Sequence, residues 1–164
     1  MRGKPGSSWQ IHVNASPERT FDYVAALESH PQWAMEQMTV APEASGPATV
    51  GSRYQVEGAI SNKRQRATVT VTELERPVRF AFESADESSI TGHAFTFTPY
   101  GGGTLVAHQI FAIKQPLVGS LMLRVRRSAV EAGFNRQLSS MRSNVESAAG
   151  TSARPTSSTR APSA

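Results

Sequence analysis

The chain has 164 residues, of which 38% are hydrophobic and 18% are charged, a balance that supports one folded domain with one core. It contains no cysteine, which excludes disulfide scaffolds, thiolate metal sites and cysteine nucleophiles. The formal net charge is +4, but residues 9–149 hold 13 basic and 13 acidic side chains. A general attraction to polyanions is therefore not expected, and nucleic acid is not expected as a partner.

The two ends of the chain differ from its middle. Residues 1–8 lack the apolar core of a secretory leader, and no stretch is apolar over the ~18 residues that a membrane span requires. We therefore expect a cytoplasmic protein without a membrane span. Residues 1–8 are expected to form a flexible N-terminus and residues 9–149 the folded domain. Residues 150–164 are rich in Ser, Thr, Pro and Ala, which predicts a disordered tail.

The folded part is expected to begin with one strand and two short helices. Large apolar and polar side chains alternate over residues 9–14, a pattern typical of a half-buried strand. Ser16 and Pro17 then form an N-cap and a first helical residue, which predict a helix that runs to about Leu27. Trp33 and Met38 predict a second short apolar helix or turn.

Strands and one long helix are expected to form the rest of the domain. Alternating apolar and β-branched residues, separated by turn residues, predict an antiparallel meander of strands at residues 53–60, 66–75, 78–84, 90–98 and 104–114. Three glycines at 101–103 predict the last hairpin. Residues 118–148 then predict a long helix, whose apolar stripe comprises Leu123, Arg127, Val130, Phe134, Leu138, Met141 and Val145.

Several segments resemble one known superfamily. Residues 11–21 (IHVNASPERTF) are similar to the opening of the SRPBCC (START-like, polyketide cyclase/dehydrase and lipid-transport) superfamily. Trp33, VGSRY at residues 50–54, VTELERP at residues 71–77, and the hairpin from TFTP at residues 96–99 to Gly103-Thr104 also resemble it. The resemblance spans residues 9–148.

This resemblance implies a fold of the α+β class. The expected order of elements resembles the helix-grip fold, in which a curved antiparallel sheet wraps around a long C-terminal helix and two short helices follow the first strand. The resemblance further implies a cavity between the sheet and the long helix that holds a hydrophobic or aromatic small molecule.

Two histidines are the candidates for polar chemistry in that cavity. His93 and His108 are expected on the inner face of the last two strands, with Phe95 and Ile110. If residue 95 lies opposite residue 108, and 93 opposite 110, the two imidazoles are diagonal neighbours. They would then hydrogen-bond or transfer protons to a carbonyl or enol, because imidazole titrates near neutral pH. The alternative is that they are ordinary core histidines.

Other inward positions are expected to contact the same ligand. Trp33 is expected at the pocket mouth or in the core, and the Tyr54 phenol either donates to a ligand or packs in the core. Arg127 either binds a carboxylate or carbonyl in the cavity or pairs with Glu131 one turn away. The remaining expected lining residues are Val56, Val69, Val71 and Phe134.

No metal site or cofactor is expected. His12 falls on an outward strand position and His30 in a helix connection, so the histidines do not form a ligand set. Two basic clusters, residues 63–66 and 124–127, are interpreted as solvated surfaces.

The leading functional hypothesis is a protein that binds a hydrophobic or aromatic small molecule. A polyketide cyclase or dehydratase that uses the same cavity is the first alternative, and a protein or nucleic-acid interaction module is the second. The identity of the ligand, the occurrence of catalysis and the oligomeric state stay open.

Overall fold

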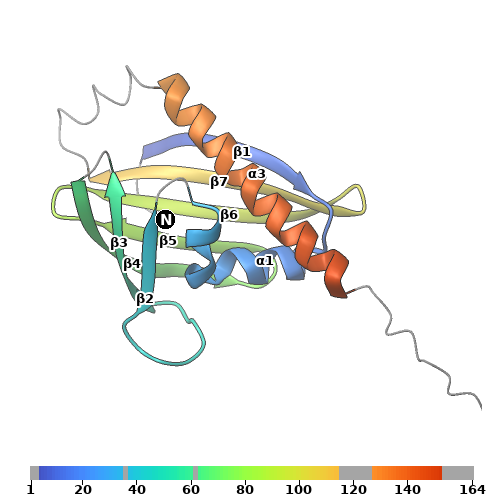
Figure 1. The fold of residues 1–164 in the computed structure, drawn as a ribbon, viewed down its shortest axis with the longest axis horizontal. Coiled ribbons are helices and arrows are strands. Elements are labelled where there is room, and N and C mark those ends of the chain that lie inside the picture. The colour runs from blue at the N-terminus through green and yellow to red at the C-terminus, as the bar shows by residue number, and fades with distance from the viewer. Residues whose placement is uncertain (1–3, 35–36, 61–62, 115–126, 153–164) are drawn as a thin grey trace, which may run out of the picture.

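A computed structural model describes residues 4–34, 37–60, 63–114 and 127–152. Its main element is a seven-stranded antiparallel sheet with the strand order β1-β7-β6-β5-β4-β3-β2 (Figure 1). Each strand from β2 to β6 pairs with the strand that follows it in the chain, whereas β1 pairs with β7. The strands are β1 (Lys4–Val13), β2 (Met38–Pro42), β3 (Arg53–Ile60), β4 (Lys63–Glu75), β5 (Arg79–Ala85), β6 (Ile90–Tyr100) and β7 (Gly103–Lys114).

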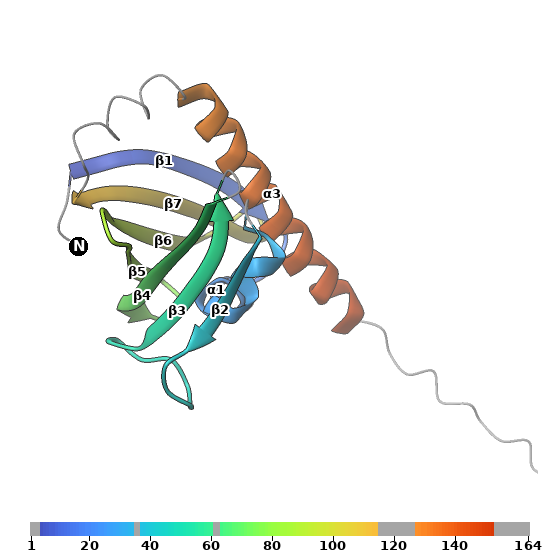
Figure 2. The same cartoon turned by 60° about the vertical axis from the view of Figure 1, so that its left-hand side comes forward.

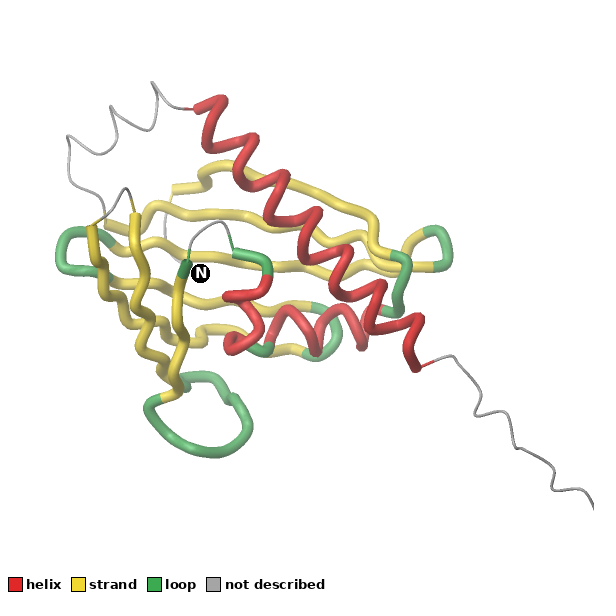
Figure 3. The backbone as a smooth tube through the Cα atoms, viewed as in Figure 1, coloured by secondary structure: helices red, strands yellow, loops and turns green. Residues whose placement is uncertain are grey.

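The described residues also form the helices α1 (Pro17–Ala25) and α3 (Arg127–Ser152) and the 3-10 helix η1 (Leu27–Gln32). These helices lie on the same face of the sheet, and α3 crosses it diagonally (Figure 3). The sheet is curved, so that β1 and β7 run at a steep angle to β2 and β3 (Figure 2). These features confirm the expected α+β helix-grip architecture. No helix among the described residues is long and apolar enough to cross a membrane.

Strand β1 is longer than expected. It begins at Lys4, which pairs with Ala112 of β7, whereas the sequence predicted that the strand starts at residue 9. A register irregularity between Pro5 and Ser8 interrupts the ladder. Gly6 is tightly placed there, since a Cβ atom would lie 2.6 Å from the carbonyl oxygen of Ile110. Backbone pairing extends the strand through residues that lack apolar alternation, which explains the error.

The segment after β1 follows the prediction at its start and departs from it at its end. The Oγ atom of Ser16 accepts a hydrogen bond from the backbone N–H of Arg19 (3.4 Å), and Pro17 opens α1, as expected. The helix ends at Ala25, before the expected limit of Leu27. Met38, expected in a second helix or turn, instead begins strand β2. This edge strand is defined by its pairing with β3, a contact that local sequence patterns do not show.

The meander and its last hairpin agree with the prediction. Strands β3 to β7 occur where strands were expected, although β4 begins at Lys63 and the expected turn at residues 61–62 lies outside the described part. Gly101 and Gly102 have φ angles of 56° and 78°, which favour glycine in the tight turn between β6 and β7. Gly103 has no room for a side chain, because a Cβ atom would lie 2.3 Å from the carbonyl oxygen of Val13.

Helix α3 contributes one side of the core. Leu138, Met141 and Val145, from the expected stripe, are buried, and Phe134 packs partly buried against them and the sheet. Residues 118–126, also expected to be helical, lie outside the described residues. The helix continues to Ser152 and so includes residues 150–152 of the segment expected as the tail. The rest of that tail, residues 153–164, lies outside the described part of the chain.

Candidate functional site

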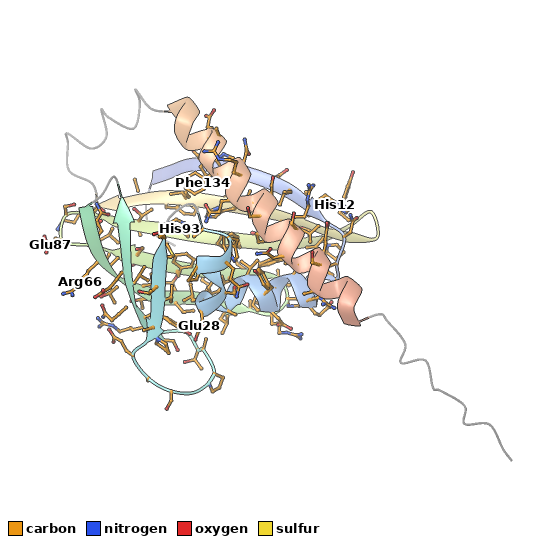
Figure 4. All side chains as sticks on the ribbon, viewed as in Figure 1. His12, Glu28, Arg66, Glu87, His93 and Phe134 are labelled. Carbon is orange, nitrogen blue, oxygen red and sulfur yellow. The ribbon has the colours of Figure 1, made fainter. Side chains whose placement is uncertain are left out.

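The two candidate histidines meet on the inner face of the sheet. Phe95 pairs with His108 and His93 pairs with Ile110, which is the register that makes the histidines diagonal neighbours. The Nδ1 atom of His93 lies 3.1 Å from the Nε2 atom of His108, a hydrogen-bond distance. His93 lies between the sheet and the helices (Figure 4). Strand register therefore places two imidazoles where they can act together.

Each of these imidazoles stacks on a phenylalanine ring. The ring of His108 is nearly parallel to that of Phe95, with centroids 4.1 Å apart, and the ring of His93 stacks on Phe82 at 4.8 Å. The indole of Trp9 and the ring of Phe134 lie on further sides of His108, with centroids 6.1 and 5.8 Å away. The aromatic neighbours limit rotation of both imidazoles, so their nitrogen atoms keep fixed directions.

A third histidine belongs to this cluster, and the sequence did not identify it. His30 is buried on η1, and its Nε2 atom lies 2.8 Å from the carbonyl oxygen of Val24, to which the N–H donates. Its ring centroid lies 5.8 Å from that of Phe82, the ring on which His93 stacks. Its placement results from the chain reversal between α1 and η1, for which the sequence carries no clear signal.

The three histidines are uncharged at neutral pH. Burial lowers the pKa of His30 to about 4. Burial, followed by repulsion from a charge on His30, lowers the pKa of His93 to about 4. Burial lowers the pKa of His108 well below its ordinary value, and repulsion from charges on His93 and His30 lowers it further. A neutral imidazole has one N–H donor and one acceptor nitrogen, so each of the three rings can both donate and accept a hydrogen bond.

Two adjacent cavities lie beside these histidines: all three histidines line the first, the inner chamber, and His93 also lines the second, the outer chamber. The inner chamber has a volume of about 150 Å³, and the outer chamber one of about 330 Å³. Residues from η1, from strands β2 to β7 and from α3 contribute to the walls, so the space lies between the sheet and the helices. Both chambers are lined by Ala34, Met38, Val56, Ser84, His93 and Gln137.

The two chambers differ in chemistry. The remaining walls of the inner chamber are mostly apolar or aromatic: Leu27, His30, Trp33, Val40, Val69, Phe82, Phe95 and His108. The remaining walls of the outer chamber are mixed: Gly58, Gln65, Arg66, Ala67, Asp86, Ser89, Thr91 and Phe134. Arg66 pairs with Glu57 (2.9 Å), and Asp86 accepts hydrogen bonds from Ser88 and Ser89. A largely apolar cavity beside a small number of polar groups is typical of small-molecule sites.

Most of the residues expected to bind ligand line these chambers. Trp33, Val69, Phe95 and His108 line the inner one, Phe134 the outer one, and Val56 and His93 both. Their contact with a ligand stays a prediction. The sequence did not identify Leu27, Phe82 or Gln137, because their direction depends on packing between elements.

Three of the expected ligand-binding residues lie elsewhere, and one is not described. Tyr54 lines a separate cavity beside the loop between β2 and β3, and burial raises the pKa of its phenol. Val71 is buried in the core, and Ile110 packs partly buried against the core. Arg127 begins α3, but its side chain lies outside the described residues.

Two buried polar atoms at the inner chamber have no hydrogen-bond partner among the described residues. They are the Nε1 atom of Trp33 and the Nδ1 atom of His108. The side chains are almost fully enclosed, since Trp33 is 2% exposed and His108 is 1% exposed. Buried polar groups in folded proteins are usually paired. These two atoms are therefore exceptions to the usual pairing of buried polar groups among the described residues.

The described residues do not form a metal site. In the part of the chain that the structure describes, no three or more histidine, aspartate or glutamate side chains are arranged so that they could hold a metal ion. His12 lies away from the cluster, where its Nε2 atom is 3.0 Å from the carbonyl oxygen of Tyr100.

Comparison with known proteins identifies the family. The family described as "Polyketide cyclase / dehydrase and lipid transport" matches residues 7–146. A search of the curated proteins finds no match.

Solved structures share the fold. A START superfamily protein from Mycobacterium smegmatis is 18% identical, with a TM-score of 0.69, and the match covers 88% of this chain and 99% of that one. The protein TTHA0849 from Thermus thermophilus is also 18% identical, with a TM-score of 0.69 and coverage of 86% and 97%. The di-domain ARO/CYC StfQ from the steffimycin biosynthetic pathway is 14% identical, with a TM-score of 0.64 and coverage of 86% and 44%. The chain therefore belongs to the polyketide cyclase/dehydrase and lipid transport family and has the START-like fold.

Proposed function

We propose that the protein binds a hydrophobic or aromatic small molecule between its sheet and α3. The observation that carries this proposal is the pair of adjacent chambers, one with mostly apolar walls and one with mixed walls, that share six lining residues. Transfer of apolar surface from water into such a space is favourable, by about 25 cal/mol per Å². Membership of a family described by polyketide cyclisation and lipid transport supports the same conclusion.

Native mass spectrometry of gently purified protein tests this proposal. A reproducible additional mass of a small molecule is expected, and loss of that mass under denaturing conditions would show non-covalent binding. Extraction of the released molecule then provides a ligand for calorimetry. A stoichiometric protein or RNA partner, with no small molecule, would contradict the proposal.

A matched pair of variants locates the binding site. Val56 lines both chambers, whereas Val78 is exposed on the turn between β4 and β5. Val56→Phe adds volume inside the chambers and is expected to weaken binding at least about tenfold. Val78→Phe adds the same atoms at the surface and should leave the dissociation constant unchanged. Equal effects of the two substitutions would place the ligand elsewhere.

One observation favours a catalytic role as a second candidate. The hydrogen bond between His93 and His108 links a half-buried imidazole to a fully buried one, an arrangement that can move a proton to or from a bound carbonyl compound. His93→Gln and His108→Gln retain hydrogen bonding but cannot transfer a proton near neutral pH. Loss of turnover with retained binding would indicate an enzyme, whereas loss of affinity alone would indicate a carrier or sensor.

A further inference from the structure

The helices α1, η1 and α3 meet at a cluster of polar side chains, the helix junction, which comprises Tyr23, Gln32 and Asn144. The Nδ2 atom of Asn144 donates to the phenol oxygen of Tyr23 (3.1 Å) and to the backbone carbonyl oxygen of Gln32 (3.4 Å). The Tyr23 hydroxyl donates in turn to the Oε1 atom of Gln32 (3.1 Å). The three residues, one from each helix, therefore form a closed network of hydrogen bonds, whose members support one another.

The helix junction lies outside both chambers, whereas η1 forms part of a chamber wall. No junction residue lines either of the two chambers that the described residues form. Leu27 and His30 of η1 line the inner chamber, and so do Trp33 and Ala34, which follow η1 directly. A movement of η1 away from the sheet would therefore open this chamber, and the junction is one of the contacts that oppose such a movement.

The two ends of η1 are attached to different parts of the fold. Near its start, the Oγ atom of Ser29 donates to the carbonyl oxygen of Tyr23, and the Nε2–H of His30 donates to that of Val24, both at 2.8 Å. These bonds join η1 to the backbone of the helix that precedes it. Its last residue, Gln32, is bonded to α3 through the helix junction. The end of η1 can therefore leave α3 while its start stays on α1.

Helix α1 is itself fixed to the sheet. Its residues Phe21 and Val24 are buried, and the ring of Phe21 contacts that of Phe97 edge to face. The guanidinium of Arg76, in the turn between β4 and β5, donates two hydrogen bonds to the carboxylate of Asp22 (2.6 and 2.9 Å). A movement at the start of η1 therefore leaves α1 in place.

Of the described walls of the inner chamber, η1 is held by the fewest kinds of contact. The strands are joined by backbone ladders, and α3 packs a buried apolar stripe against the core. By contrast, η1 is a six-residue 3-10 helix with Pro31 inside it, and its main contacts are with α1 and the edge strand β2. Short 3-10 helices have poorer hydrogen-bond geometry than α-helices, and segments of low local stability open first.

We propose that η1 is a gate of the inner chamber and that the helix junction keeps it closed, with Asn144 as a positioning residue on α3. This proposal rests on the proposed function, and it adds the route by which a ligand enters and leaves. The ligand passes when the end of η1 separates from α3 and carries Trp33 and Ala34 outward. The junction then controls the rates of ligand entry and release, and not the affinity of the closed chamber.

Hydrogen exchange of the full-length protein tests the junction without a ligand. The amides of Trp33 and Ala34 donate to the carbonyl oxygen of His30, so their exchange reports opening at the end of η1. Asn144→Ala removes the bonds from α3, and these amides should then exchange about two- to tenfold faster, as expected for the loss of such bonds. The amide of Phe97, bonded within the sheet region, should keep its wild-type exchange rate.

Stopped-flow fluorescence tests the gate with N-phenyl-1-naphthylamine, an uncharged aromatic dye whose emission rises in apolar surroundings. In Asn144→Ala, the association and dissociation rate constants should both increase, by about the factor that hydrogen exchange measures. The dissociation constant should therefore change by less than about twofold. A residue that only supported the chamber walls would instead change the dissociation constant.

Two further variants serve as confirmation and control. Tyr23→Phe keeps the ring and removes the hydroxyl, while Asn144 still bonds to the backbone of Gln32, so the same changes should appear with smaller size. Ser143→Ala is the matched control, because Ser143 is exposed and its hydroxyl bonds to the carbonyl oxygen of Ser139 within α3. It should change neither exchange nor binding rates. Thermal unfolding, followed by circular dichroism, checks that each variant is folded.

The results that would overturn the gate differ in what they say about the proposed function. If both junction variants leave exchange at Trp33 and Ala34 unchanged, the junction does not hold η1. If exchange increases but the rate constants for the dye stay at their wild-type values, the ligand enters elsewhere and the proposed function stands. A molecule found by native mass spectrometry replaces the dye if wild type does not bind it. If neither binds, the proposed function fails together with the gate.

Discussion

The Nδ1 atom of His93 and the Nε2 atom of His108 lie 3.1 Å apart, in a bond that joins β6 to β7 on the inner face of the sheet. It depends on a register in which His108 faces Phe95 and His93 faces Ile110. A slip of one residue would turn one histidine to the opposite face of the sheet. The turn at Gly101 and Gly102, with its positive φ angles, sets this register.

The histidine cluster should make the fold sensitive to acid. The pKa values of His30 and His93 are about 4 in the folded protein, against 6.5 for an ordinary imidazole. Between pH 4 and pH 6.5, the histidines of the unfolded chain therefore bind protons that the same histidines do not bind in the folded protein. The contribution of these histidines to the free energy of unfolding should be fully present above pH 6.5. It should decrease as the pH drops toward 4, by up to about 3 kcal/mol per histidine. Urea unfolding between pH 7 and pH 5 measures this slope.

Two substitutions test whether the histidine cluster causes this dependence of the unfolding free energy on pH. His93→Gln removes one buried imidazole, so the dependence of unfolding free energy on pH should become shallower. His12→Gln is the control, because His12 lies on β1 and bonds to the backbone of Tyr100, away from the cluster. Identical slopes in wild type and His93→Gln would contradict the assignment.

Truncation of the buried stripe of α3 should cost more than truncation of its exposed side. Leu138→Ala opens a cavity against the sheet and is expected to reduce the free energy of unfolding by about 2–5 kcal/mol. Ser140→Ala, two residues away and exposed, should change it by no more than about 0.5 kcal/mol. Chemical unfolding of both variants provides the comparison, and similar values would show that α3 does not pack as described.

Gly103 should not tolerate a side chain. A Cβ atom there would lie 2.3 Å from the carbonyl oxygen of Val13, so β1 and β7 would have to separate. Gly103→Ala is expected to lower the free energy of unfolding by at least about 2 kcal/mol. Gly58→Ala is a milder comparison, since its nearest contact would be 3.3 Å, to the carbonyl oxygen of Gln37. A neutral Gly103→Ala would contradict the close approach of the two strands.

Trp33 should report occupation of the inner chamber. Its indole lines the chamber and is 2% exposed, whereas Trp9 stacks on Phe134. Ligand binding should therefore change tryptophan emission in wild type, and most of that change should disappear in Trp33→Phe. A full signal in Trp33→Phe, with unchanged affinity, would place the ligand away from Trp33.

Much of the candidate site was predictable, because its residues belong to regular patterns. Alternation along β6 and β7 places His93, Phe95 and His108 on one face, and the turn glycines indicate the hairpin. Tyr54 and Val71 have equally good strand patterns but lie away from both chambers. A strand pattern specifies the face of a residue, but it does not specify whether that face meets a cavity or packed side chains.

Local sequence patterns predict the strands of the meander, the N-cap at Ser16 and the apolar stripe of α3, since these depend on side chains close together in the chain. The order of these elements and the family resemblance predict the class of the fold. The tertiary structure decided the pairing of residues 4–8 with β7, the edge strand at Met38–Pro42 and the inclusion of His30 in the cluster. It also decided that the ring nitrogens of Trp33 and His108 are buried without partners among the described residues. These features depend on contacts between separate elements that exclude water from one another. Such contacts join residues distant in the chain, so local sequence patterns do not specify them.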